Sequence, residues 1–308
     1  VLAPLRARAA AISGMAGEWT RTAAEYRALV PLIDAQYGHD HPEVMNAHFN
    51  LGVALRHLRD DAGALGEFRE AARIGEARLA PSPGLATLLD GVGSTLSQLG
   101  QVAAALPYLE RAYAMARATL PADDPRLATV GSALGATLLE LRRYPEARAR
   151  LEEAIALYER LGRRGVSDWA LAHYDLGLIE LRTARCDRAL APLGQALAAY
   201  RALAAGDPYD VHTTLNLLGE CQLALGRWAA AAASAATVLA AHDVDPGVRA
   251  MAGYVHGRAR AGAGDREGGI AEVRAVRAEL VRAGAPPPAD TAVAPAVADL
   301  DGWLAAQR

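Results

Sequence analysis

The residues of this chain that could hold a metal ion are its 8 histidines, and their densest cluster is His39-Asp40-His41. Imidazole and carboxylate groups are metal ligands, but a stable site needs about four donors that converge on one point. These three residues stand in one loop ahead of a helix start, and no second cluster completes the set. We interpret the segment as loop structure and expect no metal ion and no cofactor.

Other patterns that could support catalysis are equally incomplete. Acidic pairs at 123–124 and 152–153 fall in a loop and on a solvated helix face, and Cys186 and Cys221 lack C-x-x-C spacing. The glycine-rich segment 262–269 could pass for a phosphate-binding loop, yet no strand precedes it. The chain also has no lysine, which a P-loop, a protein kinase or a Schiff-base enzyme requires. We therefore expect no enzymatic activity from this chain.

The feature that organises the whole chain is a spaced set of small residues that recurs seven times. Each copy starts from a small anchor residue, followed by small or turn-forming residues seven, twelve and nineteen positions later, as in Gly93/Gly100/Ala105/Ala112. The anchors stand at 10, 52, 93, 135, 177, 219 and 257. A nearly fixed period of this size is typical of a solenoid of stacked units, each contacting only its neighbours.

Each repeat is predicted to form two helices joined by a short turn. Between residues 40 and 79, apolar side chains recur at helical spacing before and after a break at 59–61. Asp40 is the predicted N-cap of the first helix, with Pro42 just inside it, and similar starts recur at Ser82, Ser167 and three later Asp-Pro pairs. A mid-helix glycine costs about 1 kcal/mol against alanine, so the anchor glycines indicate close helix contact. The expected facing residues are Ala64, Ala105, Ala147 and Ala189.

The C-terminal part departs from the regular period. The last step between anchors is the shortest, so we expect a shortened second helix near 229–241. We assign residues 1–284 to the solenoid and 285–308 to a proline-rich spacer followed by a capping helix at 290–306. A terminal cap is needed because the last repeat otherwise exposes its apolar face.

Several polar or reactive side chains occupy repeated packing positions. His48 and His173 both stand four residues before an anchor, where Leu89 and Leu215 stand in other repeats, so we expect packed, hydrogen-bonded histidines. Cys186 takes the position that Trp19, Tyr144 and Trp228 fill elsewhere, which favours a packed, free thiol.

The recurring pattern of small residues resembles the tetratricopeptide repeat. The segments that carry the resemblance include HFNLGVALRHLRDDAGALGEFREAARI and ALGATLLELRRYPEARARLEEAIALYERLG. The period exceeds the usual length of about 34 residues, and YGHDHPEVMNAHFNLG is similar to the long repeats of kinesin light chains. The array ending in DLDGWLAAQR also resembles the C-terminal regions of large bacterial Ser/Thr protein kinases of the myxobacterial type. The resemblance implies an all-α, right-handed α-solenoid of seven helical hairpins plus a C-terminal cap.

In this family the binding surface is the concave groove lined by the first helix of each repeat. The resemblance therefore implies groove residues at fixed offsets from the anchors, where polar side chains could bond an extended peptide. These are Asn46, Phe49, Asn50, Arg56, Asp90, Ser94, Tyr174, Asp175, Arg182, Asn216 and Glu220. Chaperone-binding members hold a C-terminal carboxylate with Lys and Asn, but those positions here carry Ala7, Phe49, Val53, Asp90 and Ser94. We do not expect a chaperone tail as the ligand.

The sequence thus predicts a non-catalytic protein- or peptide-binding scaffold, a regulatory segment of a larger cytoplasmic signalling protein such as a kinase. The alternatives are a peptide-sensing domain of a transcription regulator, and an enzyme whose site is assembled across repeats. A formal net charge of -3 provides no basic field for nucleic acid. No apolar run approaches the roughly 18 residues that a membrane span needs. The partner, the oligomeric state and any domain ahead of Val1 stay open.

Overall fold

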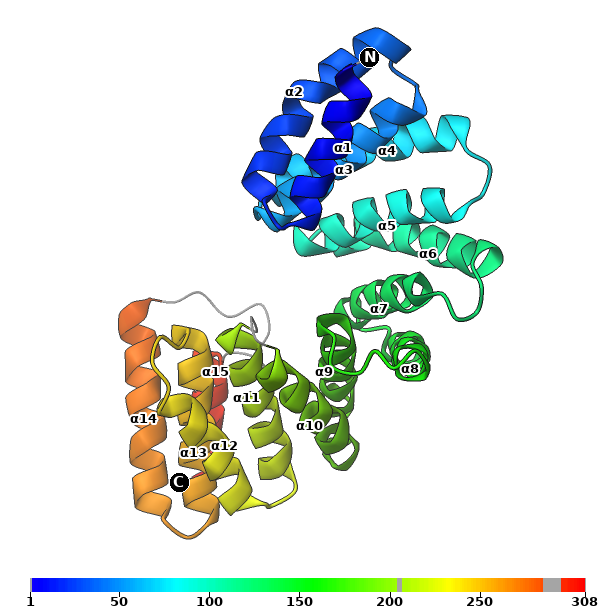
Figure 1. Cartoon of the computed structure of the whole chain (residues 1–308). Helices are drawn as coiled ribbons and strands as arrows, with labels where there is room; N and C mark the ends of the chain where they lie inside the picture. Colours follow the sequence, from blue (N-terminus) through cyan, green and yellow to red (C-terminus); the bar gives the residue numbers. More distant parts are fainter. Residues whose placement is uncertain (1, 204–206, 285–294, 308) are drawn as a thin grey trace. The chain divides into compact units, whose positions relative to one another are not determined.

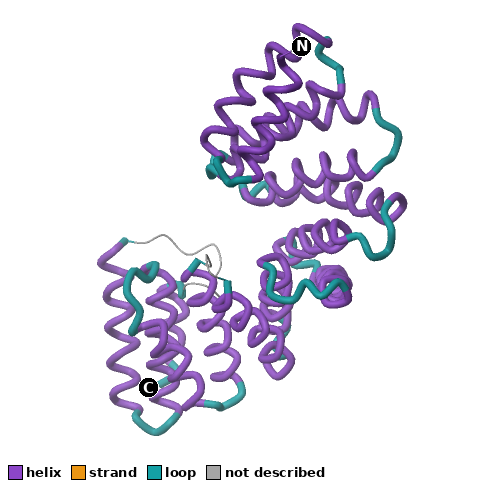
Figure 2. Tube along the Cα trace, in the orientation of Figure 1, coloured by secondary structure: helices purple, strands orange, loops and turns teal. Residues whose placement is uncertain are grey.

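The computed structural model describes residues 2–203, 207–284 and 295–307, and within these ranges every regular element is a helix (Figure 1, Figure 2). The nearly fixed spacing of the anchors and the caps at the helix starts explain why the helices have similar lengths and why short loops separate them. The elements are α1 (Leu2–Met15), α2 (Trp19–Tyr37), α3 (Pro42–His57), α4 (Asp61–Arg78), α5 (Pro83–Gln98), α6 (Val102–Thr119), α7 (Pro125–Glu140), α8 (Tyr144–Arg160), α9 (Ser167–Arg182), α10 (Cys186–Ala202), α11 (Pro208–Ala224), α12 (Trp228–Leu239), α13 (Pro246–Gly262), α14 (Arg266–Ala283) and α15 (Val297–Ala305).

The helices form seven consecutive hairpins followed by α15, as the sequence predicts. The chain divides into two compact units, which we call unit 1 (Val1–Leu157) and unit 2 (Tyr158–Arg308). Within each unit a helix packs against the helices just before and after it, for example α5 against α4 and α6. First helices of successive repeats also meet directly, such as α5 with α7 and α11 with α13. This arrangement confirms the all-α, solenoid-type fold.

The predicted helix starts are confirmed by side-chain caps on four first helices. The capping oxygens belong to Ser82, Asp124, Asp207 and Asp245, each accepting a hydrogen bond from a backbone N–H of the first turn. The prediction that Asp40 caps α3 was wrong. The N-cap of α3 is His41, whose Nδ1 accepts a hydrogen bond from Glu43 N at 3.1 Å. Asp40 instead forms an ion pair with Arg73 at 2.8 Å. Helix α9 begins at Ser167 as predicted, but its N-cap is Val166, which offers no side-chain bond.

The anchor glycines do lie at close helix contacts, but the facing residue differs from the prediction. A Cβ placed on Gly93 would lie 2.6 Å from Leu109 Cγ, and one on Gly177 would lie 2.5 Å from Leu193 Cδ2. The contact is therefore the leucine four positions beyond the predicted alanine, one helical turn further on. The predicted alanines are fully buried beside these contacts. Gly219 is an exception, because its nearest neighbour is Val255 of α13 rather than a residue of α12.

Every hairpin turn places a residue in the left-handed region seven positions after the anchor. Repeats one, three, six and seven use glycine there: Gly17, Gly100, Gly226 and Gly264. The other three repeats use Arg59, Arg142 and Ala184, with φ of 64°, 59° and 56°. A side chain in this conformation costs about 1–2 kcal/mol because its Cβ crowds the backbone. The geometry explains why the sequence pattern tolerates both glycine and longer residues at this position.

We expect Ala184→Gly to raise the free energy of unfolding of unit 2 by about 0.5–1 kcal/mol. The substitution relieves the left-handed strain of an exposed residue, and the greater flexibility of the unfolded chain offsets only part of that gain. Gly226→Ala is the matched reverse change in the neighbouring hairpin and should lower stability by a similar amount. Urea denaturation of both variants measures the effect, and two shifts of the same sign would contradict it.

The C-terminal end follows the prediction in outline. Helix α12 has 12 residues whereas α10 has 17, which confirms the shortened second helix. The last helix, α15, runs over Val297–Ala305 rather than 290–306, and Leu300 is fully buried in a core cluster that includes Tyr254 and Val273. The predicted spacer at 285–288 lies outside the described residues, as does the proposed start of the cap at 290. The division at residue 284 stays a prediction.

Candidate functional site

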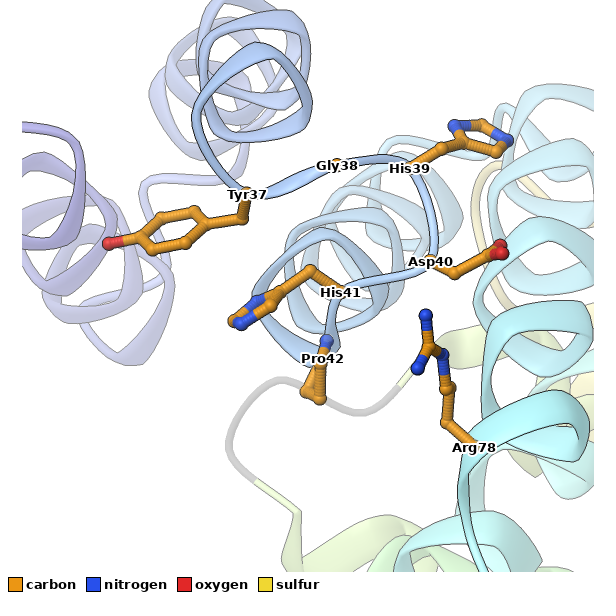
Figure 3. A pocket seen from close by; sticks show the side chains of 7 residues that line it. All are labelled: Tyr37, Gly38, His39, Asp40, His41, Pro42 and Arg78. Carbon is orange, nitrogen blue, oxygen red and sulfur yellow. The ribbon is translucent and has the colours of Figure 1, made fainter.

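The loop that carries the histidine cluster spreads its side chains instead of gathering them. Figure 3 shows His39 and His41 pointing to opposite sides of the loop, around a pocket of about 260 Å³ that also contacts Arg78. His41 stacks on Tyr37 with ring centroids 4.6 Å apart, and His39 Nε2 lies 3.1 Å from a Glu70 oxygen. Among the described residues no three candidate metal ligands come together. This geometry matches the interpretation of the segment as loop structure.

The acidic pairs and the glycine-rich segment have structural roles. Asp124 caps α7, and the carboxylate of Glu153 accepts a 2.6 Å hydrogen bond from the Tyr113 hydroxyl. Arg150 donates to both of these groups, at 2.9 Å to Glu153 and 2.7 Å to the hydroxyl. The segment 262–269 spans the turn between α13 and α14, as predicted. Asp124 thus stabilises a helix start, and Glu153 joins α6 to α8 through Tyr113.

The histidines at packing positions differ from each other. His48 Nδ1 lies 2.6 Å from Glu67 Oε2, which confirms a hydrogen-bonded histidine joining α3 to α4. His173 is buried, but neither ring nitrogen has a partner among the described residues, so the predicted hydrogen bond was wrong there. Its ring meets Trp169 edge-on, with centroids 4.3 Å apart. Burial lowers the pKa of the His173 imidazole, which favours the neutral form of the ring.

The predicted groove positions of unit 1 begin on α3. Asn46 is exposed, whereas Phe49, Asn50 and Arg56 are half-buried. Asn50 Nδ2 donates to the Asn46 carbonyl at 2.9 Å, and its Oδ1 has no partner among the described residues. Because residues three, four and seven apart share one face of a helix, these side chains form a continuous strip along α3.

Phe68 of α4, the second helix of the same repeat, packs against this strip. Its side chain is 1% exposed, and its ring lies 5.6 Å from the Phe49 ring, centroid to centroid. The Arg56 guanidinium lies 5.7 Å from the same Phe68 centroid, and no carboxylate among the described residues pairs with it. Arg56 is thus held by a ring and not by an anion. Leucine fills the equivalent position in repeats three, four and five, so the spacing pattern alone does not single out Phe68 as a support for Arg56.

Helices α5 and α7 carry small hydroxyl side chains at the next positions, and those of Thr137 and Ser132 are buried. Ser94 Oγ donates to Asp90 Oδ1 at 3.1 Å, so the predicted acidic residue is already engaged within its own helix. Ser97 and Thr137 share a 2.9 Å hydrogen bond that joins α5 to α7. Ser132 Oγ is buried without a hydrogen-bond partner among the described residues. The predicted positions of unit 1 therefore combine the Arg56 guanidinium with small polar side chains.

In unit 2 most of the predicted groove side chains contact other residues of the protein. Glu220 accepts from Arg258 Nη1 at 2.9 and 3.2 Å, which joins α11 to α13. The Arg258 guanidinium lies 5.0 Å from the Tyr254 centroid, and the Tyr254 hydroxyl donates to the Asp299 carbonyl of α15. The acidic group expected to meet a ligand is thus part of an ion pair between repeats.

Two other predicted residues of unit 2 lie deeper than expected. Asn216 is fully buried, and its Nδ2 donates to the Val248 carbonyl of α13 at 2.9 Å. The buried amide links two first helices, and a contact between Asn216 and a ligand stays a prediction. Asp175 is also buried, whereas Tyr174 and Arg182 are half-buried on α9. Each of these three α9 residues already takes part in an interaction within the chain.

Both family models that match this chain describe the tetratricopeptide repeat. A family model of the tetratricopeptide repeat matches residues 16–80, 132–197 and 174–246, and a second model with the same description matches 83–160. The first of these models alone covers more than half of the chain. No curated protein sequence matches the chain significantly.

Solved structures agree on the fold at low sequence identity. BtubC (BKLC) from P. vanneervenii is similar at a TM-score of 0.54 and 20% identity, covering 80% of this chain and 95% of that one. A putative kinesin light chain from Podosopora anserina has a TM-score of 0.53 and 18% identity, with 68% and 96% covered. PilW, a type IV pilus biogenesis factor, has a TM-score of 0.57 and 16% identity, with 78% and 93% covered. At these identities the likeness extends to the fold alone.

Proposed function

Because the chain belongs to the tetratricopeptide repeat family, we propose that it is a non-catalytic module that binds another protein or an extended peptide. The observation that carries this proposal is the strip on α3, where Arg56 lies against an aromatic ring and no carboxylate of the described residues pairs with it. A guanidinium presents a rigid fork of donors that fits a carboxylate. The ligand supplies the anion that the protein does not.

The neighbouring groups define the rest of the ligand. Asn50 Oδ1 can accept a hydrogen bond from a backbone N–H, while Phe49 provides an apolar contact. Aromatic and arginine side chains of this kind often contribute most of the energy of a protein interface. The ligand of unit 1 is therefore a peptide segment with a carboxylate close to an apolar side chain. One neutralised cation makes binding only modestly dependent on salt.

The wider role follows the resemblance to signalling proteins. We infer that the module serves as a regulatory or scaffold segment of a larger bacterial protein in the cytoplasm, with a Ser/Thr kinase as the expected neighbour. No helix among the described residues has the length and apolar character to span a bilayer. Sequencing upstream of Val1 tests the context: a kinase domain supports it, whereas a helix-turn-helix would indicate a peptide-sensing transcription regulator.

Selection from a phage-displayed peptide library tests the binding surface directly. We expect the selected peptides to carry Asp, Glu or a free C-terminus beside an apolar residue. Removing a charge-assisted pair costs about 1.5–3 kcal/mol, so Arg56→Ala should weaken binding by roughly 10- to 100-fold in calorimetry. Arg56→Lys should lose part of that affinity, because it keeps the charge without the fork.

The matched control is Arg111→Ala, which removes an exposed guanidinium on α6 that pairs with Glu76. The Arg111→Ala variant should bind the selected peptides with the same affinity as the unaltered chain. If Arg111→Ala weakened the selected peptides while Arg56→Ala left them unchanged, binding would take place on the second helices and the proposal would be wrong.

A further inference from the structure

His173, on α9 of unit 2, is a buried imidazole without a hydrogen-bond partner. The residue is 8% exposed, and neither ring nitrogen has a partner among the described residues. One turn earlier on the same helix, the indole Nε1 of Trp169 is likewise buried and unpartnered. The two rings meet edge-on, with centroids 4.3 Å apart. Within the described residues, the ring therefore has no hydrogen-bond acceptor for an added proton.

The equivalent histidine of unit 1 shows what His173 lacks. His48 occupies the same repeat position, four residues before an anchor, and its Nδ1 lies 2.6 Å from the Glu67 carboxylate of α4. The residue of α10 that corresponds to Glu67 is Pro192, which has no polar side chain. Leucine fills the histidine position in repeats three and six. His173 is thus an ionisable group at an apolar position, and its partner helix supplies no carboxylate at the place where α4 supplies one to His48.

The carboxylates on α8 and on α9 itself are engaged by other groups. The charge of Glu159 on α8 acts to raise the pKa of the His173 ring, but burial has the larger effect and lowers it. Glu159 also pairs with Arg164, whose Nη2 lies 3.4 Å from its Oε2. On α9, Asp168 accepts a hydrogen bond from the Tyr158 hydroxyl at 3.3 Å.

The next helices, α10 and α11, both pack against α9 (Figure 1). The buried titratable side chains of α10 are the free thiol of Cys186 and the phenol of Tyr200, whose pKa is raised by burial. On α11, Glu220 is paired with Arg258, and burial raises the pKa of the Asp210 carboxyl. The charged form of the α9 histidine is therefore a buried cation without a hydrogen-bonded carboxylate, which is an unfavourable state.

We propose that His173 is an acid-sensitive switch, whose protonation loosens α9 from α10 in unit 2. An exposed imidazole binds a proton below a pKa of about 6.5, whereas the buried ring has a lowered pKa and resists protonation. The opened form takes up the proton first, so unit 2 loses stability as the pH falls below about 6.5. Above that pH both forms are neutral, and the ring contributes no pH dependence. This proposal does not depend on the peptide-binding function.

Hydrogen exchange of the full chain at about pH 7.5 and about pH 5.5, corrected for the intrinsic pH dependence of exchange, tests the switch. One extra proton in the opened form changes the opening constant by up to about tenfold per pH unit. We therefore expect amide protection in α9 and α10 to fall by up to about tenfold more than protection in α3 and α4.

His173→Leu should remove this additional loss of protection. The variant should fold, because leucine is buried at the same position in repeats three and six, as Leu89 and Leu215. His48→Leu is the matched control and should leave the loss in α9 unchanged, because it alters only the histidine that has a carboxylate partner.

An NMR titration of His173 in the unaltered chain examines the ring without a substitution. The imidazole should stay neutral in folded molecules at pH 6.5 and gain its proton only at lower pH. The proposal is overturned if the folded ring titrates at or above about pH 6.5, since Trp169 or Glu159 would then stabilise the imidazolium. It is also overturned if α9 loses the same protection in His173→Leu, or if α3 and α9 lose protection equally.

Discussion

We expect Gly177→Leu to lower the free energy of unfolding of unit 2 by about 3 kcal/mol or more. A Cβ at this position would lie 2.5 Å from both Leu193 Cγ and Cδ2, closer than carbon atoms approach in folded proteins. The remaining three carbons of leucine have no space between α9 and α10, so the hairpin must separate. Urea denaturation followed by circular dichroism measures the loss.

The same hairpin provides a matched control for Gly177→Leu. Gly194 lies on the exposed side of α10, and a Cβ there would meet nothing within 4 Å. Gly194→Ala should therefore stabilise unit 2 by about 0.5–1 kcal/mol, the usual helix preference for alanine. Adding Leu193→Ala to Gly177→Leu should restore part of the loss, because it vacates the contested volume. Equal melting curves for the Gly177 and Gly194 variants would show that the anchor is not at a close contact.

The second large effect is expected at Phe68, where we predict that Phe68→Ala costs about 3–5 kcal/mol. The side chain is 1% exposed and fills the space above two glycines, since a Cβ on Gly52 or Gly91 would lie 2.9 or 3.0 Å from its ring. Its removal leaves a cavity between repeats two and three and takes away the ring beneath Arg56. Denaturant unfolding of unit 1 reports the stability loss.

Phe68→Leu separates packing from the aromatic support of the binding strip. Leucine fills the equivalent position at 109, 151 and 193, so this variant should lose less than about 1.5 kcal/mol. It should nevertheless bind a selected acidic peptide less tightly, because Arg56 loses its ring. Phe49→Ala, at a half-buried position, should cost less stability than Phe68→Ala. If the Phe68 and Phe49 truncations were equally mild, Phe68 would not be a core residue.

Much of the fold could be predicted because its rules act between near neighbours in the chain. Helix starts at Ser82, Asp124, Asp207 and Asp245 depend on a cap that bonds a backbone N–H two or three residues later. The shortened α12 followed from counting residues between anchors. Even the errors in local structure were small, since the cap of α3 moved by one residue, from Asp40 to His41.

The site was harder to predict because its geometry depends on which helix each side chain meets. Offset from an anchor suggests which face of a helix a residue occupies, but not how deeply the neighbouring helix covers it. Asn216 is buried because α13 passes over it, whereas Asn50, at nearly the same offset in repeat two, is half-exposed. The pairing of Arg258 with Glu220 likewise joins residues from two repeats. Such contacts require the stacked structure.

Gly219 contacts Val255 of α13 and not a residue of α12, and this contact determines how repeat six unfolds locally. Helix α12 buries only Ala231, Ala235 and Val238, so its separation exposes little apolar surface. The first helices hold each other independently of α12, through Gly219 against Val255 and the Asn216 bond to α13. Local opening of α12 therefore leaves α11 and α13 joined, and the array can fray at its outer layer while the chain of first helices stays continuous.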